Sequence, residues 1–402
     1  MRMRPVYAVA ALLASAACSS PDDASGDFHL ELVQAPTTVT PGSVVPQSVL
    51  VRVVNGDGTS ISGVPVTWSI QSGGGTLTPS ADTSGVDGLA TAQWTPGLAT
   101  GSQAIGASIY DQPALTIAVN AAAFRADKIG TSYRAGCGIL AGAAWCWDFG
   151  SATTATVSRV MSQVHARDIA MGSTFVCVLD ESGAVLCHRW FLNQNLDEVV
   201  GVSGLPALSA ISGGNTSFCG ISQVDRTPWC WRAGTWVGTQ VSSTLQLTEL
   251  SVGSSEACGL TAEGIAWCWG EVPAPLPGGH EFRQLSVGLF KSCGIVAPAQ
   301  LYCWDGTHPE PAYFGISASQ VAVGYSAGIV NAPLGATEFF SWSIEPPQYN
   351  LGSTFPLPVV QLSSQDDMPC VIAFDAAVYC LGVNDNIEQV YKSTWEAIPA
   401  QP

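Results

Sequence analysis

The sequence predicts an all-β protein in which a β-sandwich is followed by a seven-bladed β-propeller. Apolar residues alternate with polar ones in short runs between turn residues, and no helical period competes with them. One pattern of roughly 40 residues recurs through most of the chain. Only 11% of the residues are charged and 42 are glycine, so the composition is that of a folded, β-rich chain rather than a disordered one.

Residues 1–18 have the pattern of a secretory signal peptide. Two arginines precede a short apolar run from Val6 to Ala17, which ends in small residues and is too short to span a bilayer as a mature helix. The run resembles a bacterial lipoprotein signal, and this resemblance implies lipidation of Cys18. Plain secretion is the alternative. We therefore expect a bacterial outer-membrane or cell-surface lipoprotein, or a secreted protein, with residues 19–27 as a linker.

The charge balance argues against nucleic acid as a partner. The formal net charge is −17, and the 14 basic residues form no cluster in the sequence. Binding to a phosphate backbone needs clustered Lys and Arg side chains. We expect a monomer that contacts a membrane only through a lipid on Cys18.

Residues 28–123 are predicted to form the sandwich. The strand patterns read FHLELV, SVLVRVV, PVTWSI, GLATAQW and ALTIAVNA, with turn residues such as NGDGTS and QSGGG between them. The run GVPVTWSIQSGGGTLTP, followed by TSGVDGLATAQWTPG, resembles the bacterial Ig-like domain of invasin- and intimin-type surface proteins. This resemblance implies a spacer. Trp68 and Trp94 alternate with polar neighbours, so we expect them in the core, with a surface contact role as the alternative.

Residues 124–402 contain seven copies of one pattern: a glycine, a cysteine, a hairpin, and a second cysteine beside an aromatic residue. The copies begin at Gly130, Gly172, Gly214, Gly253, Gly288, Gly324 and Gln365. The sixth copy has lost both cysteines and is expected to have Ser341 at the second position. The seventh has lost the glycine. Repeats of this length, each a small all-β unit, are typical of a β-propeller, whose closure hides exposed strand edges.

The repeats are similar to those of the regulator of chromosome condensation family. CGLTAEGIAWCWG, from Cys258 to Gly270, carries the resemblance best. It implies a seven-bladed propeller, and some members of the family are protein-binding modules. The histidine that many members have before the first cysteine is replaced here. Its equivalents are Phe175, Ser217, Glu256 and Lys291. The resemblance therefore implies the fold and says little about a specific function.

The repeats hold 12 of the 13 cysteines, and these are predicted to form six disulfides. The pairs are Cys137 with Cys146, Cys177 with Cys187, Cys219 with Cys230, Cys258 with Cys268, Cys293 with Cys303, and Cys370 with Cys380. Residues about ten apart around a turn lie opposite each other on antiparallel strands, close enough for a disulfide after small adjustments. The sixth copy has lost its two cysteines together, as a bonded pair would. Zinc and redox sites need closer spacing, such as Cys-x-x-Cys, which is absent from the sequence.

No catalytic, cofactor-binding or metal-ligating constellation is predicted. The five histidines are isolated, and His188 takes the place of a tryptophan in its repeat. Asp366 and Asp367 read as a loop, and the NGDGTS run at Asn55 reads as a β-turn rather than a calcium loop. Seven tryptophans beside second cysteines are expected to pack between blades, with an aromatic binding surface as the alternative. They are Trp145, Trp147, Trp229, Trp231, Trp267, Trp269 and Trp304.

The expected function is therefore non-enzymatic binding of a protein or glycan by the propeller, with the Ig-like domain as spacer. The loops that differ between copies, such as WFLNQNLDEVV, VPAPLPGGHEF and SIEPPQYNLGSTFPLP, are the expected recognition surfaces. The alternative is a secreted carbohydrate-active enzyme with a site in the propeller channel. Two carboxylates about 5–9 Å apart in one groove would favour that alternative.

Overall fold

The computed structural model describes residues 28–400 with short internal gaps. The gaps are 43, 111, 133–134, 149–154, 190–195, 271, 307–308, 325–326, 333–336, 342–347, 350–354, 366–367 and 382–394. Cys18, Asp366 and Asp367 lie outside the described residues. The described chain is all strand, bend and turn, as predicted, and contains no α-helix. Accordingly, this part of the chain has no helix with the length and apolar character needed to cross a membrane.

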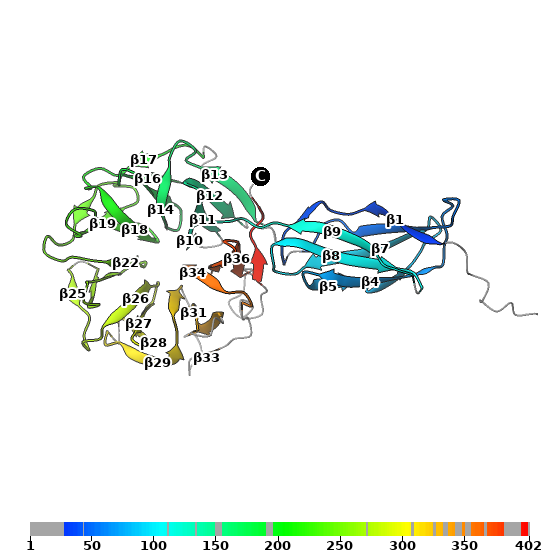
Figure 1. The fold of residues 1–402 in the computed structure, drawn as a ribbon. Coiled ribbons are helices and arrows are strands. Elements are labelled where there is room, and N and C mark those ends of the chain that lie inside the picture. The colour runs from blue at the N-terminus through cyan, green and yellow to red at the C-terminus, as the bar shows by residue number, and fades with distance from the viewer. Residues whose placement is uncertain are drawn as a thin grey trace, which may run out of the picture.

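The N-terminal part is a sandwich of two sheets (Figure 1). The first sheet runs β1 (His29–Gln34), β3 (Val49–Val54), β7 (Leu89–Pro96), β5 (Gly75–Thr78). The second runs β2 (Thr38–Val39), β9 (Leu115–Ala121), β8 (Gly101–Ser108), β4 (Pro65–Ser72), β6 (Ala81–Thr83). Alternating side chains of both sheets meet in one core. Trp68 and Trp94 belong to it, at 4% and 0% exposure, as the alternation predicted.

The C-terminal part is a ring of seven four-stranded antiparallel sheets, each formed by consecutive strands. The first three are β10 (Lys128–Ser132), β11 (Ala135–Leu140), β12 (Ala143–Asp148), β13 (Thr156–Val160); β14 (Ala166–Met171), β15 (Val176–Asp180), β16 (Val185–His188), β17 (Val200–Gly201); and β18 (Leu208–Gly214), β19 (Ser217–Ser222), β20 (Pro228–Arg232), β21 (Thr239–Gln240). The fourth and fifth are β22 (Glu249–Val252), β23 (Ala257–Leu260), β24 (Ala266–Trp269), β25 (Ala274–Pro275); and β26 (Phe282–Val287), β27 (Lys291–Val296), β28 (Gln300–Asp305), β29 (Ala312–Ser317). The last two are β30 (Gln320–Val323), β31 (Ala327–Asn331), β32 (Thr337–Ser341), β33 (Gln348–Tyr349); and β34 (Val359–Gln365), β35 (Met368–Ala373), β36 (Val378–Leu381), β37 (Trp395–Ala397). The first strand of every sheet faces the centre of the ring.

All six expected disulfides are present, each between the second and third strands of one sheet. The paired cysteines lie directly opposite each other in the strand register, with Cα atoms 4.0–4.1 Å apart. The turn between the second and third strands therefore determines which residues lie opposite each other, and so which cysteines can form a disulfide.

The sixth sheet corrects one prediction. Its register places Ile329 opposite Phe339 at the cysteine positions, whereas Ser341 pairs with Ala327 two residues further along. The inner-strand pairing agrees, because Ala322 lies opposite Ile329 just as Ser251 lies opposite Cys258 in the fourth sheet. An apolar cross-strand pair thus replaces the disulfide here. The separation of Ile329 and Phe339 is ten residues, as between Cys258 and Cys268, so the hairpin length is unchanged. Letter matching misplaced the position because the serine that precedes a tryptophan in this copy lies two residues beyond the position of the second cysteine.

The sandwich and the ring are joined through the seventh sheet, next to β36 (Figure 1). The Tyr379 hydroxyl donates a hydrogen bond to the Leu98 carbonyl of the sandwich, and the Thr100 hydroxyl donates to the Asp375 carboxylate. Burial, and then the negative charge of Asp375, raise the pKa of the Tyr379 hydroxyl, which keeps it protonated as a donor. The two parts therefore share a hydrogen-bonded contact rather than a bare tether.

The connecting segment also closes the ring. The Phe124 N–H donates to the Ile398 carbonyl at 2.7 Å, and the Phe124 carbonyl accepts from the Val378 N–H at 2.8 Å. Phe124 is fully buried between the first and last sheets. No described sheet mixes strands from both ends of the ring, so this segment adds backbone hydrogen bonds to the direct contacts between the first and last sheets.

Candidate functional site

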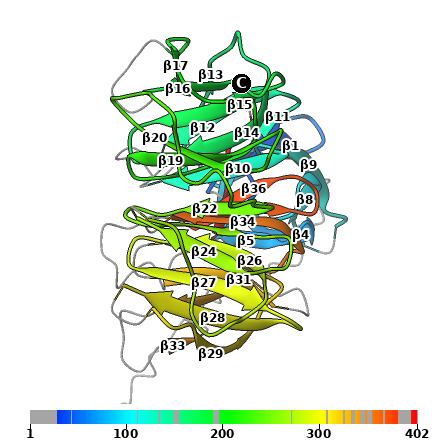
Figure 2. The same cartoon turned by 90° about the vertical axis from the view of Figure 1, so that its left-hand side faces the viewer.

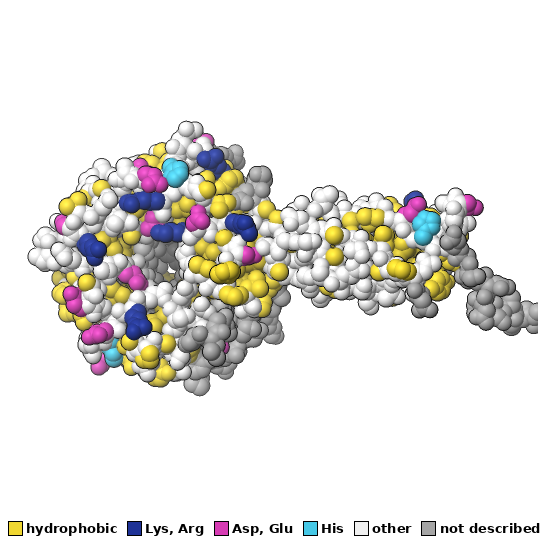
Figure 3. Space-filling model, in the orientation of Figure 1, with side chains coloured by type: hydrophobic (Ala, Val, Ile, Leu, Met, Phe, Trp, Pro, Cys, Tyr) yellow, Lys and Arg dark blue, Asp and Glu magenta, His cyan; other side chains and the backbone are white. Residues whose placement is uncertain are grey.

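The centre of the ring is a polar cavity of about 350 Å³, visible as a hollow in Figure 3. Two sets of side chains from the innermost strands surround it, and we call these sets the first and second collars. Each side chain of a collar bonds to the backbone of the next sheet. In the first collar, carboxylate or amide oxygens accept from backbone N–H groups: Asp168 from Ile211 (3.1 Å), Glu249 from Leu285 (2.7 Å), Gln284 from Val321 (3.0 Å) and Gln361 from Ile129 (3.3 Å). In the second collar, hydroxyls do the same: Ser212 from Val252 (3.1 Å), Ser251 from Val287 (2.9 Å) and Ser286 from Val323 (2.9 Å).

These collars use the polar atoms of the cavity to hold the ring together. Asp168 also accepts a hydrogen bond from Lys128 at 3.0 Å, so its charge is paired. It lines the cavity, and Glu249, the other carboxylate of the same collar, accepts a hydrogen bond from the Leu285 N–H. Both of these carboxylates are therefore engaged in hydrogen bonds between neighbouring sheets.

The repeat glycines mark one face of the ring, where the first strand of each sheet turns into the second. We call this the glycine face, defined by Gly172, Gly214, Gly253 and Gly288. A Cβ atom on Gly253 would lie 2.2 Å from the Gly288 carbonyl oxygen, and one on Gly214 would lie 2.3 Å from the Gly253 carbonyl oxygen. The glycines recur because the inner strands of neighbouring sheets meet there with no room for a side chain.

The predicted tryptophans mostly build the contacts between sheets. Trp147, Trp231, Trp269 and Trp304, which follow the second cysteines, are at most 6% exposed. Each belongs to a core cluster with the disulfide of the preceding sheet; for example, Trp231 packs with Cys177 and Cys187. Trp145, Trp229 and Trp267 are half-buried in the same clusters. The predicted packing between blades is confirmed for these residues.

His188 and the NGDGTS run both have structural roles. The ring of His188 is buried at a tryptophan position, and its Nδ1 lies 2.7 Å from the Glu198 carbonyl oxygen. The NGDGTS run is a turn in which the Asp57 carboxylate accepts hydrogen bonds from both the N–H and the hydroxyl of Thr59. These bonds lower the pKa of Asp57.

A second group of residues on the glycine face includes the half-buried Phe175 and Trp236 and several exposed apolar side chains. The rings of Phe175 and Trp236 meet edge to face at 5.0 Å, and the Arg189 guanidinium lies 5.7 Å from the centre of the Phe175 ring. Trp236 has a φ of +52°, which is rare for a bulky residue and holds the indole over the boundary between the second and third sheets. Val237, Val272 and Phe290 are more than half exposed on the same face.

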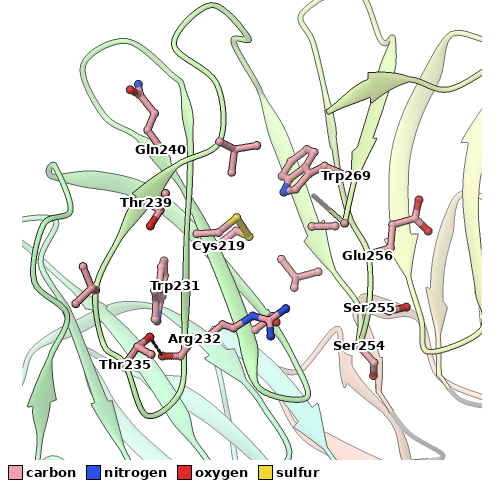
Figure 4. Close-up of a pocket in the computed structure, with 18 residues that line it drawn as sticks. Cys219, Trp231, Arg232, Thr235, Thr239, Gln240, Ser254, Ser255, Glu256 and Trp269 are labelled. Atoms are coloured by element: carbon pink, nitrogen blue, oxygen red, sulfur yellow. Dashed lines mark hydrogen bonds between the residues drawn. A yellow bond between two sulfur atoms is a disulfide. The ribbon is translucent and has the colours of Figure 1, made fainter. Parts of the chain in front are cut away.

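Two pockets open on the glycine face between sheets. The first, of about 390 Å³, lies between the third and fourth sheets, and its walls include Trp231, Arg232, Gln240 and Trp269 (Figure 4). The second, of about 330 Å³, lies between the fourth and fifth sheets and is lined by Trp269, Trp304 and Phe290, among others. Both volumes are within the range of small-ligand pockets.

Glu256 lines both pockets. It is half-buried, and burial raises the pKa of its carboxyl group. Its carboxylate lies close to the sulfur atoms of Cys258 and Cys268, but these form a disulfide and cannot act as metal-binding thiolates. The group that remains available is a single carboxylate between two aromatic-lined pockets.

No family model matches the chain. The structure resembles human WBSCR16, with a TM-score of 0.50 and 11% identity over 66% of this chain and 92% of that chain. Prp20p of Saccharomyces cerevisiae, whose binding to Gsp1p and histones has been described, has a TM-score of 0.49 and 12% identity over 66% and 84% of the chains. The WD40 β-propeller domain of Doa1 has a TM-score of 0.48 and 10% identity over 66% and 94%.

The ring is a β-propeller. Its consecutive four-stranded sheets around a central cavity carry this conclusion, and the likenesses bear on the fold alone because the identities are low. The propeller positions two distinct surfaces, a channel whose polar groups bond to neighbouring sheets and a glycine face with exposed apolar side chains and pockets.

Proposed function

We propose that this chain is a bacterial cell-surface or secreted binding protein whose seven-bladed propeller recognises a protein partner through its glycine face. The observation that carries the proposal is the contrast between the two surfaces of the propeller. The polar groups of the channel are used in the collars, whereas Phe290, Val237 and Val272 are left exposed beside two pockets. Exposed apolar groups around pockets are typical of protein-binding surfaces.

The sandwich serves in this proposal as an Ig-like spacer, and a lipid on Cys18 tethers the chain to the outer membrane. The residues that line the pockets belong to the third, fourth and fifth sheets, and these sheets lie on the side of the ring away from the sandwich (Figures 1 and 2). β1 begins at the far end of the sandwich (Figure 1). Six disulfides support an oxidising, extracytoplasmic location.

A protein partner is preferred here to a glycan or a nucleic acid. Most of the tryptophans beside the cysteines pack between sheets, so they offer no extended aromatic platform for sugars. The formal net charge of −17 and the absence of a cluster of basic residues in the sequence do not favour nucleic acid, and Lys and Arg side chains are scattered among Asp and Glu on the one face that Figure 3 shows. We do not propose the channel enzyme, because Asp168 is paired with Lys128 and Glu249 of the same collar is bonded to the Leu285 N–H.

Site-specific photo-crosslinking on living cells tests the proposal. A photoreactive phenylalanine at Phe290 on the glycine face should yield a discrete crosslinked protein. The same group at Val224, which is 88% exposed in a turn on the opposite face, should not. A glycan array, run with the purified full chain, tests the carbohydrate alternative. Crosslinking from Val224 alone, or binding to the array alone, would contradict the proposed surface.

A further inference from the structure

Glu256 has no charged partner within the described part of the propeller. The ion pair nearest in sequence, Lys291 with Asp305 at 2.9 Å, satisfies both of its own charges. Arg232 lines the first pocket with Glu256, but in Figure 4 the Glu256 carboxylate points away from Arg232. No ion pair among the described residues includes Glu256, and its Ser292 contact leaves the charge uncompensated.

The walls of the second pocket suit a long aliphatic side chain. Trp269 and Trp304 line its inner part, and Phe290 and Val272, at 58% and 78% exposure, form the rim. Lysine and arginine side chains combine an apolar stem with a cationic end, and they pack their stems along apolar surfaces. A cation at the base of this pocket would offset the burial of the Glu256 carboxylate.

We propose that the pocket between the fourth and fifth sheets receives a lysine or arginine side chain from the protein partner, with Glu256 as its counter-charge. This inference rests on the proposed function and specifies the chemistry of the partner. The net charge of −17 favours a basic partner by long-range attraction as well. A metal ion is a poorer occupant, because Asp305, the other carboxylate that lines this pocket, is paired with Lys291, and Glu256 beside a disulfide provides too few ligands by itself.

A random peptide phage library, selected on the oxidised full-length mature chain, provides the probe. Selected peptides should be enriched in Lys or Arg flanked by apolar residues. Glu256→Gln keeps the shape of the side chain and removes its charge, so it should weaken binding of these peptides about tenfold or more. Glu263→Gln is the matched control, since Glu263 is a fully exposed residue of the same sheet in the turn between β23 and β24, on the opposite face.

The outcomes separate this inference from the proposed function. Peptides that bind the glycine face but lack a basic residue, or that bind the Glu256→Gln variant equally well, overturn the charge pairing and leave glycine-face binding intact. A selection that yields no basic peptide also overturns it. Loss of binding in both the Glu256→Gln and the Glu263→Gln variants would assign the effect to net charge and likewise refute the specific site. Equal melting temperatures of the variants and the parent chain confirm that folding is unaffected.

Discussion

The sandwich and the propeller solve the problem of burying apolar surface in different ways. The sandwich has one core, in which 17 described buried residues from both sheets form a single cluster without a cysteine. The propeller divides its described core into clusters of seven to eleven residues between neighbouring sheets. Six of these seven clusters contain cysteines of a disulfide, and the seventh has Ile329 at that position. The small core clusters of the propeller are thus accompanied by disulfides, whereas the larger core of the sandwich is not.

Reduction of the disulfides should produce the largest difference between the two parts. Each loop of about ten residues contributes roughly 2–3 kcal/mol in the chain-entropy model, and six together are an upper bound that rivals the whole stability of a domain. Hydrogen exchange measured by mass spectrometry should show a loss of protection in the propeller on adding reductant. Peptides from the sandwich act as the internal control. Equal protection or equal melting with and without reductant would contradict the comparison.

Trp94→Ala should be the most damaging single change in the sandwich. The side chain is fully buried in the single core, and a substitution of this kind typically costs about 3–5 kcal/mol. Chemical denaturation should show a destabilised sandwich transition and an unchanged propeller transition. Val86→Ala, at a position that is 97% exposed, is the control. A matching shift of the propeller transition would mean that the joint at Tyr379 couples the two parts.

Gly253→Ala tests the packing of the inner strands on the glycine face. The new Cβ would meet the Gly288 carbonyl oxygen at 2.2 Å and a Val287 methyl at 2.8 Å, so backbone must shift. We expect a loss of about 1–3 kcal/mol, measured by thermal unfolding of the oxidised protein. Gly306→Ala, which meets nothing within 4 Å, should change stability by less than about 0.5 kcal/mol. An equal effect of both would refute the role given to the repeat glycines.

Gln361→Ala tests how the ring closes between its last and first sheets. The Gln361 amide makes two hydrogen bonds to the backbone of Ile129, and Gln284 makes the same two bonds to Val321 between the fifth and sixth sheets. Each bond contributes about 0.5–1.5 kcal/mol. Gln361→Ala and the matched variant Gln284→Ala should therefore lose similar stability in denaturant unfolding. A much larger loss for Gln361→Ala would show that the closing contact is the weak point of the ring.

Glu249→Gln should have the smallest effect, and one that depends on pH. Burial raises the pKa of Glu249, so the folded state binds a proton more readily than the unfolded state does. Stability therefore falls as pH rises from the unfolded pKa through the raised folded pKa. Glutamine keeps the acceptor for the Leu285 N–H without the charge, so the variant should gain a little stability at pH 7 and none near about pH 4. A loss at neutral pH would mean that the charge itself is needed in the collar.

The sequence by itself determined the elements whose partners are close along the chain. Cys258 and Cys268 are ten residues apart around a turn, so their spacing was enough to predict a hairpin, a register and a disulfide. The alternation around Trp68 and Trp94 was likewise enough to predict a buried face. Ser341 shows the limit of this reasoning, because similar letters do not reveal which residues lie opposite each other across the strands.

Only the tertiary structure decided how the repeats meet. The bond from Gln361 to Ile129 joins residues 232 positions apart, and the packing of Trp231 on Cys177 and Cys187 joins neighbouring repeats. Such contacts depend on the angle and distance between sheets, and the spacing of residues in a single sequence does not predict these two quantities. For the same reason, Glu256 became visible as a candidate only when three sheets had placed two pockets on either side of it.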